Sequence, residues 1–182
     1  TGDLVANAEV QFEDLDGVIT GSSPDELANI SGTATAGSGG DIDLTTGGAT
    51  DVFTSVVNAN VETGGELDIT GQRLEVAGNF TRASDASAEL TTSGSVLAFT
   101  SSQSNATFDP GSRFTIDGNL EVDKPNRSLT LAEAVEVSGD VTVVDPASQF
   151  ISTRLILEDN LFVSGSGTFT LDSNFEARNI NE

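Results

Sequence analysis

The sequence predicts an all-β protein, and the fold that fits best is a single-domain parallel β-solenoid with coils of about 20 residues. Three observations predict this fold. Apolar residues alternate with polar ones in very short runs, turn-forming residues such as glycine, aspartate and asparagine separate the runs, and the pattern recurs at a nearly constant spacing. The 182 residues suit one domain or one elongated body built from repeats.

Residues 1–31 are predicted to form an N-terminal strand and a short helical cap. The apolar stretch that contains Leu4, Val10 and Phe12 has the alternation of a strand. Residues 23–30 begin with a serine that can cap a helix, followed by a proline at the first helical position and two acids in the first turn. The chain opens without a methionine or a signal peptide, so we expect that an export signal has been removed.

Residues 32–182 are predicted to form a repetitive β-body, and their repeat is the strongest signal in the sequence. Residues 114–122, 135–143 and 155–163 align without gaps, and their starts are spaced by about 20 residues. Each unit has two apolar residues around a polar one, three turn-forming residues, and a second apolar pair. Residues 74–82 carry the same pattern two periods before the first unit and are aligned with it. We expect the turn glycines and asparagines to adopt left-handed backbone conformations.

An antiparallel β-sandwich of the pilin-like kind is the alternative fold. A hairpin with the three-residue loop 117–119 would keep Ile116 and Leu120 on one face, so the local alternation fits both folds. The nearly constant spacing of the units favours the solenoid, because the strands of a sandwich seldom repeat their sequence.

The repeat units resemble those of secreted parallel β-solenoid proteins of microbial surfaces, the adhesin-like and filamentous exoproteins. The units that carry the resemblance are Leu-Glu-Val-Ala-Gly-Asn-Phe-Thr at 74–81 and Val-Glu-Val-Ser-Gly-Asp-Val-Thr at 135–142. The resemblance is one of repeat style and covers roughly residues 60–177. It implies an exported, extracellular protein of the cell surface with a non-catalytic role.

The composition excludes many kinds of catalysis. The chain has no cysteine, histidine, methionine, tryptophan or tyrosine. Imidazole acid/base chemistry, thiol nucleophiles and metal sites with nitrogen or sulfur ligands therefore cannot be built. Carboxylate chemistry of the kind used by solenoid polysaccharide hydrolases and lyases is the less favoured alternative, because the chain lacks the aromatic platforms that stack on sugars. We expect no enzymatic activity.

The charge balance excludes two classes of partner. Seven basic residues stand against 29 acidic ones, which gives a net charge of −22. A chain this acidic repels nucleic acids and anionic membrane surfaces. No apolar run approaches the roughly 18 residues of a membrane span, so we expect neither nucleic-acid binding nor membrane insertion.

Acidic turns predict Ca²⁺ as the one candidate cofactor. Asp41 and Asp43 follow a glycine-rich stretch, and residues 37–44 resemble one copy of the glycine-aspartate nonapeptide that binds calcium in tandem arrays. Asp14 and Asp16 form a second acidic turn. Their oxygen ligands suit a hard cation. The alternative is that these carboxylates are solvated turn residues, in which case the protein has no cofactor.

Two asparagines are candidate glycosylation sites. Four N-x-S/T sequons occur in the chain, and one of them, at Asn79, occupies a turn of the repeat. Asn105 and Asn126 lie in polar loops and are the better acceptors for an exported protein.

These observations predict an extracellular structural subunit that self-assembles head to tail into a filament, sheath or surface layer. A stacked sheet ends in unpaired N–H and C=O groups, which can pair with another chain. A head-to-tail contact grows into an open filament when its rotation does not close. The alternative is a monomeric adhesin or stalk that binds its ligand through an apolar patch away from the ends. The partner is therefore a second copy, and the candidate interface residues are Leu4, Val10, Phe12, Phe175 and Ile180.

Overall fold

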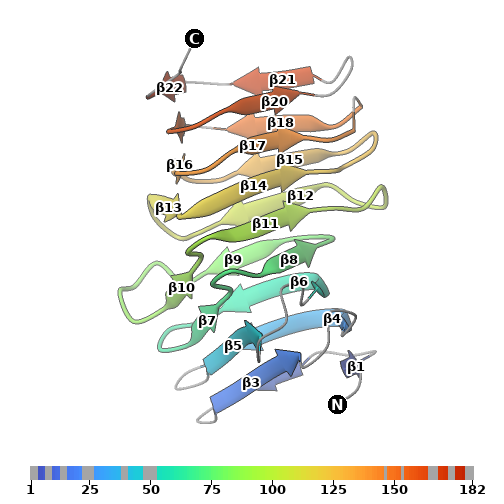
Figure 1. Cartoon of the computed structure of the whole chain (residues 1–182), viewed down its shortest axis with the longest axis vertical. Helices are drawn as coiled ribbons and strands as arrows, with labels where there is room; N and C mark the ends of the chain where they lie inside the picture. The colour runs from blue at the N-terminus through green and yellow to red at the C-terminus, as the bar shows by residue number, and fades with distance from the viewer. Residues whose placement is uncertain are drawn as a thin grey trace.

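The computed structural model of the chain is a stack of short strands that wind around one long axis (Figure 1). Its described residues form 22 strands and no helix. All ladders between these strands are parallel. The predicted parallel β-solenoid is confirmed, and the sandwich alternative is wrong because it requires antiparallel hairpins. The structure describes residues 4–6, 10–12, 16–21, 27–37, 41–46, 53–145, 147–152, 154–163, 168–171 and 175–178.

Each coil has three faces, which we number in the order in which the chain visits them. Two long strands, β4 (Leu27–Ala36) and β6 (Phe53–Val61), run along faces 1 and 2 without a break. The other strands of face 1 are β1 (Leu4–Ala6), β8 (Arg73–Val76), β11 (Ser95–Phe99), β14 (Gly118–Val122), β17 (Val141–Val143) and β20 (Leu161–Val163). The other strands of face 2 are β2 (Val10–Phe12), β9 (Phe80–Arg82), β12 (Ala106–Asp109), β15 (Ser128–Leu131), β18 (Gln149–Ser152) and β21 (Thr168–Leu171).

Face 3 is built from two separate sheets, one in each half of the stack. The break lies between β10 and β13, where the chain changes from the first sheet to the second. The first sheet contains β3 (Asp16–Gly21), β5 (Asp41–Thr46), β7 (Glu66–Asp68) and β10 (Glu89–Thr91). The second contains β13 (Phe114–Ile116), β16 (Val135–Val137), β19 (Leu155–Leu157) and β22 (Phe175–Ala177).

Pairing in register places equivalent residues of successive coils above one another, and we call each such row a column. Leu120 pairs with Leu97 of the preceding coil and with Val141 of the following coil. The three repeat units predicted over residues 114–163 align as expected, because Phe114 pairs with Val135 and Val135 with Leu155. One period of the sequence repeat is therefore one coil of the stack.

The core runs through the centre of the stack and consists of the inward columns. In strands such as β8, β16 and β17 buried and half-exposed residues alternate, as the pleat of a half-buried sheet requires. The fully buried rings of Phe80 and Phe108 pack edge to face with centroids 5.3 Å apart. Phe99 and Phe150 are also fully buried. Burial of each such side chain contributes about 1.5–3 kcal/mol.

The helix expected over residues 23–30 is wrong for its second half. Leu27–Ala36 form strand β4, which pairs with β1 on one side and with β6 on the other. A helix of two turns is marginal by itself, whereas a strand between two neighbours forms ladder hydrogen bonds along both edges. Residues 22–26 lie outside the described residues. The predicted division between residues 31 and 32 falls inside β4, where the register to β6 shifts between Ile30 and Thr33.

One repeat unit is assigned to the wrong corner by the sequence alignment. Leu74 pairs with Leu97 and through it with Leu120, so it belongs to face 1 and not to the column of Phe114 on face 3. The unit at 74–82 therefore spans the corner from face 1 to face 2. The same pattern of an apolar pair, a short turn and a second apolar pair occurs at two corners of a coil. Spacing alone therefore does not show which of the two corners a unit occupies.

Corner glycines serve two different purposes. Gly71 and Gly94 have φ of 68° and 62°, as expected for left-handed corners. Gly118 and Gly139 do not have positive φ, so the expectation is wrong for them. A Cβ on Gly118 would lie 2.4 Å from the carbonyl oxygen of Ser95, and one on Gly139 would lie 2.7 Å from that of Gly118. These two glycines allow successive coils to approach closely.

Candidate functional site

The two ends of the stack carry strands that are paired along one edge only. At one end β1 and β2 pair with β4, and β3 pairs with β5. At the other end β20, β21 and β22 pair with β17, β18 and β19 (Figure 1). Among the described residues no strand lies against the outer edge of any of these six strands. Their outward N–H and C=O groups are of the kind that a further strand can pair with.

Burial stops abruptly at the last strand of face 1. Val76, Phe99, Val122 and Val143 occupy one inward column and are fully buried. Val163 is the next member of that column and is 39% exposed. Val163 has the same side chain as Val143, the preceding member of the column. It differs in that no following coil covers it among the described residues. On face 1, the last described strand therefore leaves a member of a core column partly exposed.

Two further apolar side chains extend this exposed surface. Phe162 on β20 is 52% exposed and lies between members of two inward columns, Leu161 and Val163. Val144, which follows β17, is 38% exposed. We call Val144, Phe162 and Val163 the end patch. The remaining exposed large apolar side chain of the described part, Val57, lies on β6 in the body of the stack.

The predicted interface residues lie on terminal strands wherever the structure describes them. Leu4 is on β1, Val10 and Phe12 are on β2, and Phe175 is on β22. Ile180 lies outside the described residues. That these residues form an interface between copies stays a prediction.

The predicted calcium residues fall on the first sheet of face 3. Asp16 pairs with Asp41, Asp41 pairs with Glu66, and Asp43 pairs with Asp68. Neighbouring strands are about 4.8 Å apart, so this pairing stacks carboxylate residues in columns. Asp14 lies outside the described residues. In the part of the chain whose side chains are described, no three acidic residues converge as a metal site would need, and calcium binding stays a prediction.

Both candidate glycosylation sites are exposed. The Asn105 side chain accepts a hydrogen bond through Oδ1 from the backbone N–H of Ser128, at 3.1 Å. Asn126 lies in a turn with φ of 58°. Exposure makes both accessible to modification, and their glycosylation stays a prediction.

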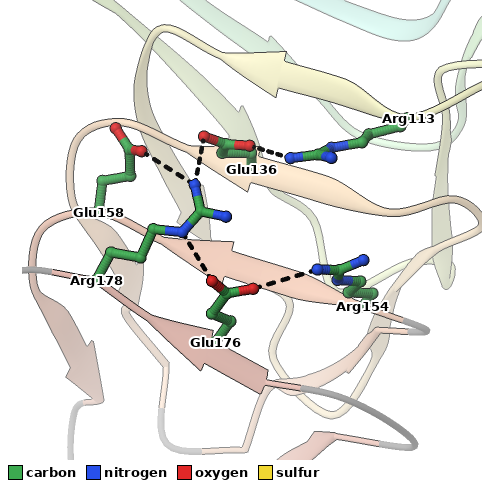
Figure 2. Close-up of polar contacts among 6 residues, drawn as sticks. All are labelled: Arg113, Glu136, Arg154, Glu158, Glu176 and Arg178. Atoms are coloured by element: carbon green, nitrogen blue, oxygen red, sulfur yellow. Dashed lines mark hydrogen bonds and ion pairs between the residues drawn. The ribbon is translucent and has the colours of Figure 1, made fainter.

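A ladder of ion pairs crosses the outer side of the second sheet of face 3, and the sequence analysis did not anticipate it. Figure 2 shows that its side chains come from successive coils and point toward one another. Arg113 donates to Glu136 at 2.7 Å, and Arg154 donates to Glu176 at 3.2 Å. A signal for it exists in the sequence, since both arginines directly precede the first inward residue of a face 3 strand.

Arg178 joins three acidic residues at the C-terminal end of this ladder. Its Nε lies 2.8 Å from Glu176, and its Nη1 lies 3.5 Å from Glu136 and 3.7 Å from Glu158 (Figure 2). The hydrogen bond from Arg113 and the charge of Arg178 hold the pKa of Glu136 below its usual value. The arginines thus compensate acidic residues that would otherwise repel one another along the stack.

A second arginine bridge spans three coils on face 1. Arg73 on β8 donates to Glu75 on its own strand and through both Nη atoms to Glu121 on β14, at 3.0 and 2.6 Å. The strand between them, β11, carries Ala98 in that column, and Ala98 is fully buried. A small residue there leaves room for the guanidinium to cross. The hydrogen bond to Glu121 raises the pKa of Arg73 further above its already high value.

The only lysine of the chain is buried at the corner between faces 1 and 2. The Lys124 ammonium donates to the carbonyl oxygens of Ala77, at 2.6 Å, and Thr100, at 2.7 Å. Its backbone N–H donates to the hydroxyl of Ser148 in the following coil, at 2.9 Å. One side chain therefore ties together the corners of successive coils.

A shallow, open depression lies at the edge of face 2. Its cation, Arg82, is already engaged with the carbonyl oxygens of Pro110 and Ala88 and lies over the ring of Phe114. The depression is lined by Asn60, Val61, Glu62, Thr63, Thr81, Arg82 and Ala83.

Comparison with known proteins adds no relative. The chain matches no model of a known protein family, and no curated protein or solved structure is significantly similar to it. In the described part of the chain, no helix is long and apolar enough to cross a membrane. The class that the fold defines is therefore a parallel β-solenoid, in which the first and last described strands of each face are paired along one edge only.

Proposed function

We propose that this protein is an extracellular structural subunit that assembles head to tail into a filament, sheath or surface layer. The observation that supports it most is the abrupt end of burial at β20, where Val163 is exposed although its column is fully buried in the preceding coils. A second copy that adds its first coil to this end would bury the end patch and pair the open strand edges. The extracellular location rests on the resemblance of the repeat units to surface solenoids.

Strand pairing and apolar burial would supply the association energy. The side chains of the end patch are already at least about half buried, so complete burial of each adds about 1 kcal/mol. The ladder hydrogen bonds require no special side-chain chemistry, so an open edge is sufficient for recognition. These gains oppose the cost of about 4–15 kcal/mol for immobilising two molecules. Assembly should therefore depend strongly on concentration.

Cations should promote assembly because both parts of the chain that meet at the contact are net negative. Residues 1–72 contain 13 acidic residues and no basic one, whereas all seven basic residues lie in 73–182, together with 16 acidic ones. Contact between copies brings the strongly acidic end against an end that is also net negative. Ca²⁺ or other divalent cations would screen this repulsion, and the stacked carboxylate residues Asp16, Asp41 and Glu66 are the best candidates to hold them.

The test compares two substitutions of the same kind. Val163→Lys places a charge in the end patch, and Val57→Lys is the matched control, because Val57 has a similar exposure but lies in the body of the stack. Sedimentation velocity and negative-stain imaging over a range of concentrations should show polymers for the unmodified protein and for Val57→Lys, but not for Val163→Lys. A chelator at low salt should reduce the polymer yield. Equal polymerisation of both variants would contradict the proposal.

The monomeric adhesin or stalk is the second candidate function. The observation that favours it is the depression beside β6 and β9, whose hydroxyl, amide and carboxylate groups offer polar contacts to a ligand. Away from the ends, however, the described surface exposes only Val57 among the large apolar side chains, which is less than a recognition patch needs. An elongated particle that stays monomeric at high concentration would favour this candidate.

A further inference from the structure

The columns of faces 1 and 2 run without interruption from the first described coil to the last. On face 1, one column begins at Leu4 and ends at Leu161, the next begins at Val5 and ends at Phe162, and the third begins at Ala6 and ends at Val163. On face 2, a column begins at Val10 and ends at Leu171. The two ends of the stack therefore present the same columns in the same strand direction.

From this continuity we infer that a second copy of the chain docks in register, with face 1 on face 1 and β1 on β20. The inference rests on the proposed function and specifies its contact. Each column continues across the junction, so that Leu4, Val5 and Ala6 of the added copy lie beside Leu161, Phe162 and Val163. On face 2 the same geometry places β2 on β21.

Two features of the ends favour this orientation over one in which the added copy is turned by one face. The end patch lies on face 1 and the corner that follows it, and aligned faces cover it with the wholly apolar strand β1. On face 3 the last strand, β22, is followed by Arg178, and the first strand, β3, begins at Asp16. When the faces are aligned, Arg178 lies at the junction with the N-terminal end of the added copy, where residues 1–72 contain no basic residue. In a copy turned by one face, Arg178 and Asp16 lie on different faces.

The absence of cysteine makes disulfide trapping a direct test of the register. In-register residues on neighbouring parallel strands are about 4.8 Å apart, within the Cα range of disulfides. The test variant is Val5→Cys with Phe162→Cys, both in an outward column whose described members include half-exposed Glu75 and Glu121. Since β1 and β20 lie at opposite ends of one copy, a disulfide must join two copies (Figure 1).

The matched control is Val5→Cys with Asn160→Cys. Residue 160 lies two positions before Phe162 and is also exposed, but this offset places the Cα atoms about 8 Å apart, beyond disulfide range. Under mild oxidation the test variant should give a ladder of covalent multimers on a non-reducing gel. The control should give none, and Phe162→Cys alone should give no species larger than a dimer. Circular dichroism checks that all variants remain folded.

The outcomes separate the register from the function. If both double variants give equal ladders of covalent multimers, or if only the control gives one, the in-register contact is overturned. Self-assembly itself would still stand in either case. Strong dimers of Val5→Cys alone, formed through two N-terminal ends, also overturn it. If the protein forms no polymers and the test variant gives no covalent ladder at any concentration or calcium level, both the register and the proposed function are overturned.

Discussion

At the residue scale, Lys124 is the most unusual side chain of the protein. Its ammonium lies in the core with two carbonyl oxygens as acceptors, and the corners that supply them, residues 77–79 and 100–105, contain no charged residue. Burial, and secondarily the charge of Arg127, lower the pKa of Lys124 to about 8. Folding therefore favours the neutral amine, and the protonated form costs stability.

This shift predicts an alkaline gain in stability. Below pH 8 the folded protein carries the cost of the buried charge, and the free energy of unfolding rises as the pH increases from about 8 toward the value of 10.5 in the unfolded chain. The gain is at most about 3 kcal/mol. Urea titrations at several pH values would measure it. No histidine, cysteine or tyrosine titrates in this range, and Lys124→Met should remove the rise. A rise that persists in that variant contradicts the assignment.

Two glycines provide a second prediction at this scale. Gly139→Ala places a Cβ against the backbone of the preceding coil, whereas at Gly71 a Cβ meets nothing within 4 Å and the cost comes only from φ. We expect Gly139→Ala to lower the free energy of unfolding by about 1–3 kcal/mol more than Gly71→Ala does. Chemical denaturation of both variants gives the difference. Equal effects would mean that the coils separate without cost.

At the scale of the elements, the ion-pair ladder on face 3 links β13, β16, β19 and β22. Glu136 is its centre, because it accepts from Arg113 on one side and from Arg178 on the other. Since these arginines lower its pKa, Glu136 stabilises the folded state above its unfolded value of 4.5, and this contribution is lost as the pH falls through the lower folded value.

Glu136→Gln should therefore weaken the C-terminal half of the stack. We expect a loss of about 1 kcal/mol at neutral pH, which shrinks at high salt and vanishes at acidic pH. Thermal unfolding at two salt concentrations and at pH 3 and 7 would measure it. Thr142→Gln, on an outward position of face 1, controls for the glutamine side chain. A loss that is independent of pH and salt would assign a packing role to Glu136.

The strands themselves were largely predictable, and their corners were not. The alternation of Val135, Val137, Val141 and Val143 fixes two strands and their inward faces, because the period of two follows from the pleat. Residues 23–30 carry helix signals that the pairing of β4 overrides. The spacing of a repeat unit does not indicate which corner of the coil it occupies. The alignment therefore assigns the unit at 74–82 to the wrong face.

At the scale of the whole molecule, the stack follows from the repeat, but its partners along the axis do not. Leu4, Val10 and Phe12 are predicted at one end from an apolar strand-like segment, and Phe175 at the other from a segment without a cap signal. The pairing places all four on terminal strands. The exposure of Val163 was missed, since it depends on which coil lacks a successor among the described residues. The ion pairs between coils were missed because they join residues that are a full coil or more apart in the chain.

The burial of Lys124 also determines how the intact molecule responds to amine-reactive reagents. The ε-amine is the sole side-chain amine of the polypeptide, and in the folded state it is shielded and hydrogen-bonded. Acylation of a native sample should thus leave this amine unmodified, whereas a denatured sample should gain one further adduct, at Lys124. Mass spectrometry would then measure the fraction of unfolded molecules directly. For the same reason, coupling through lysine would be a poor way to attach the native protein to a surface.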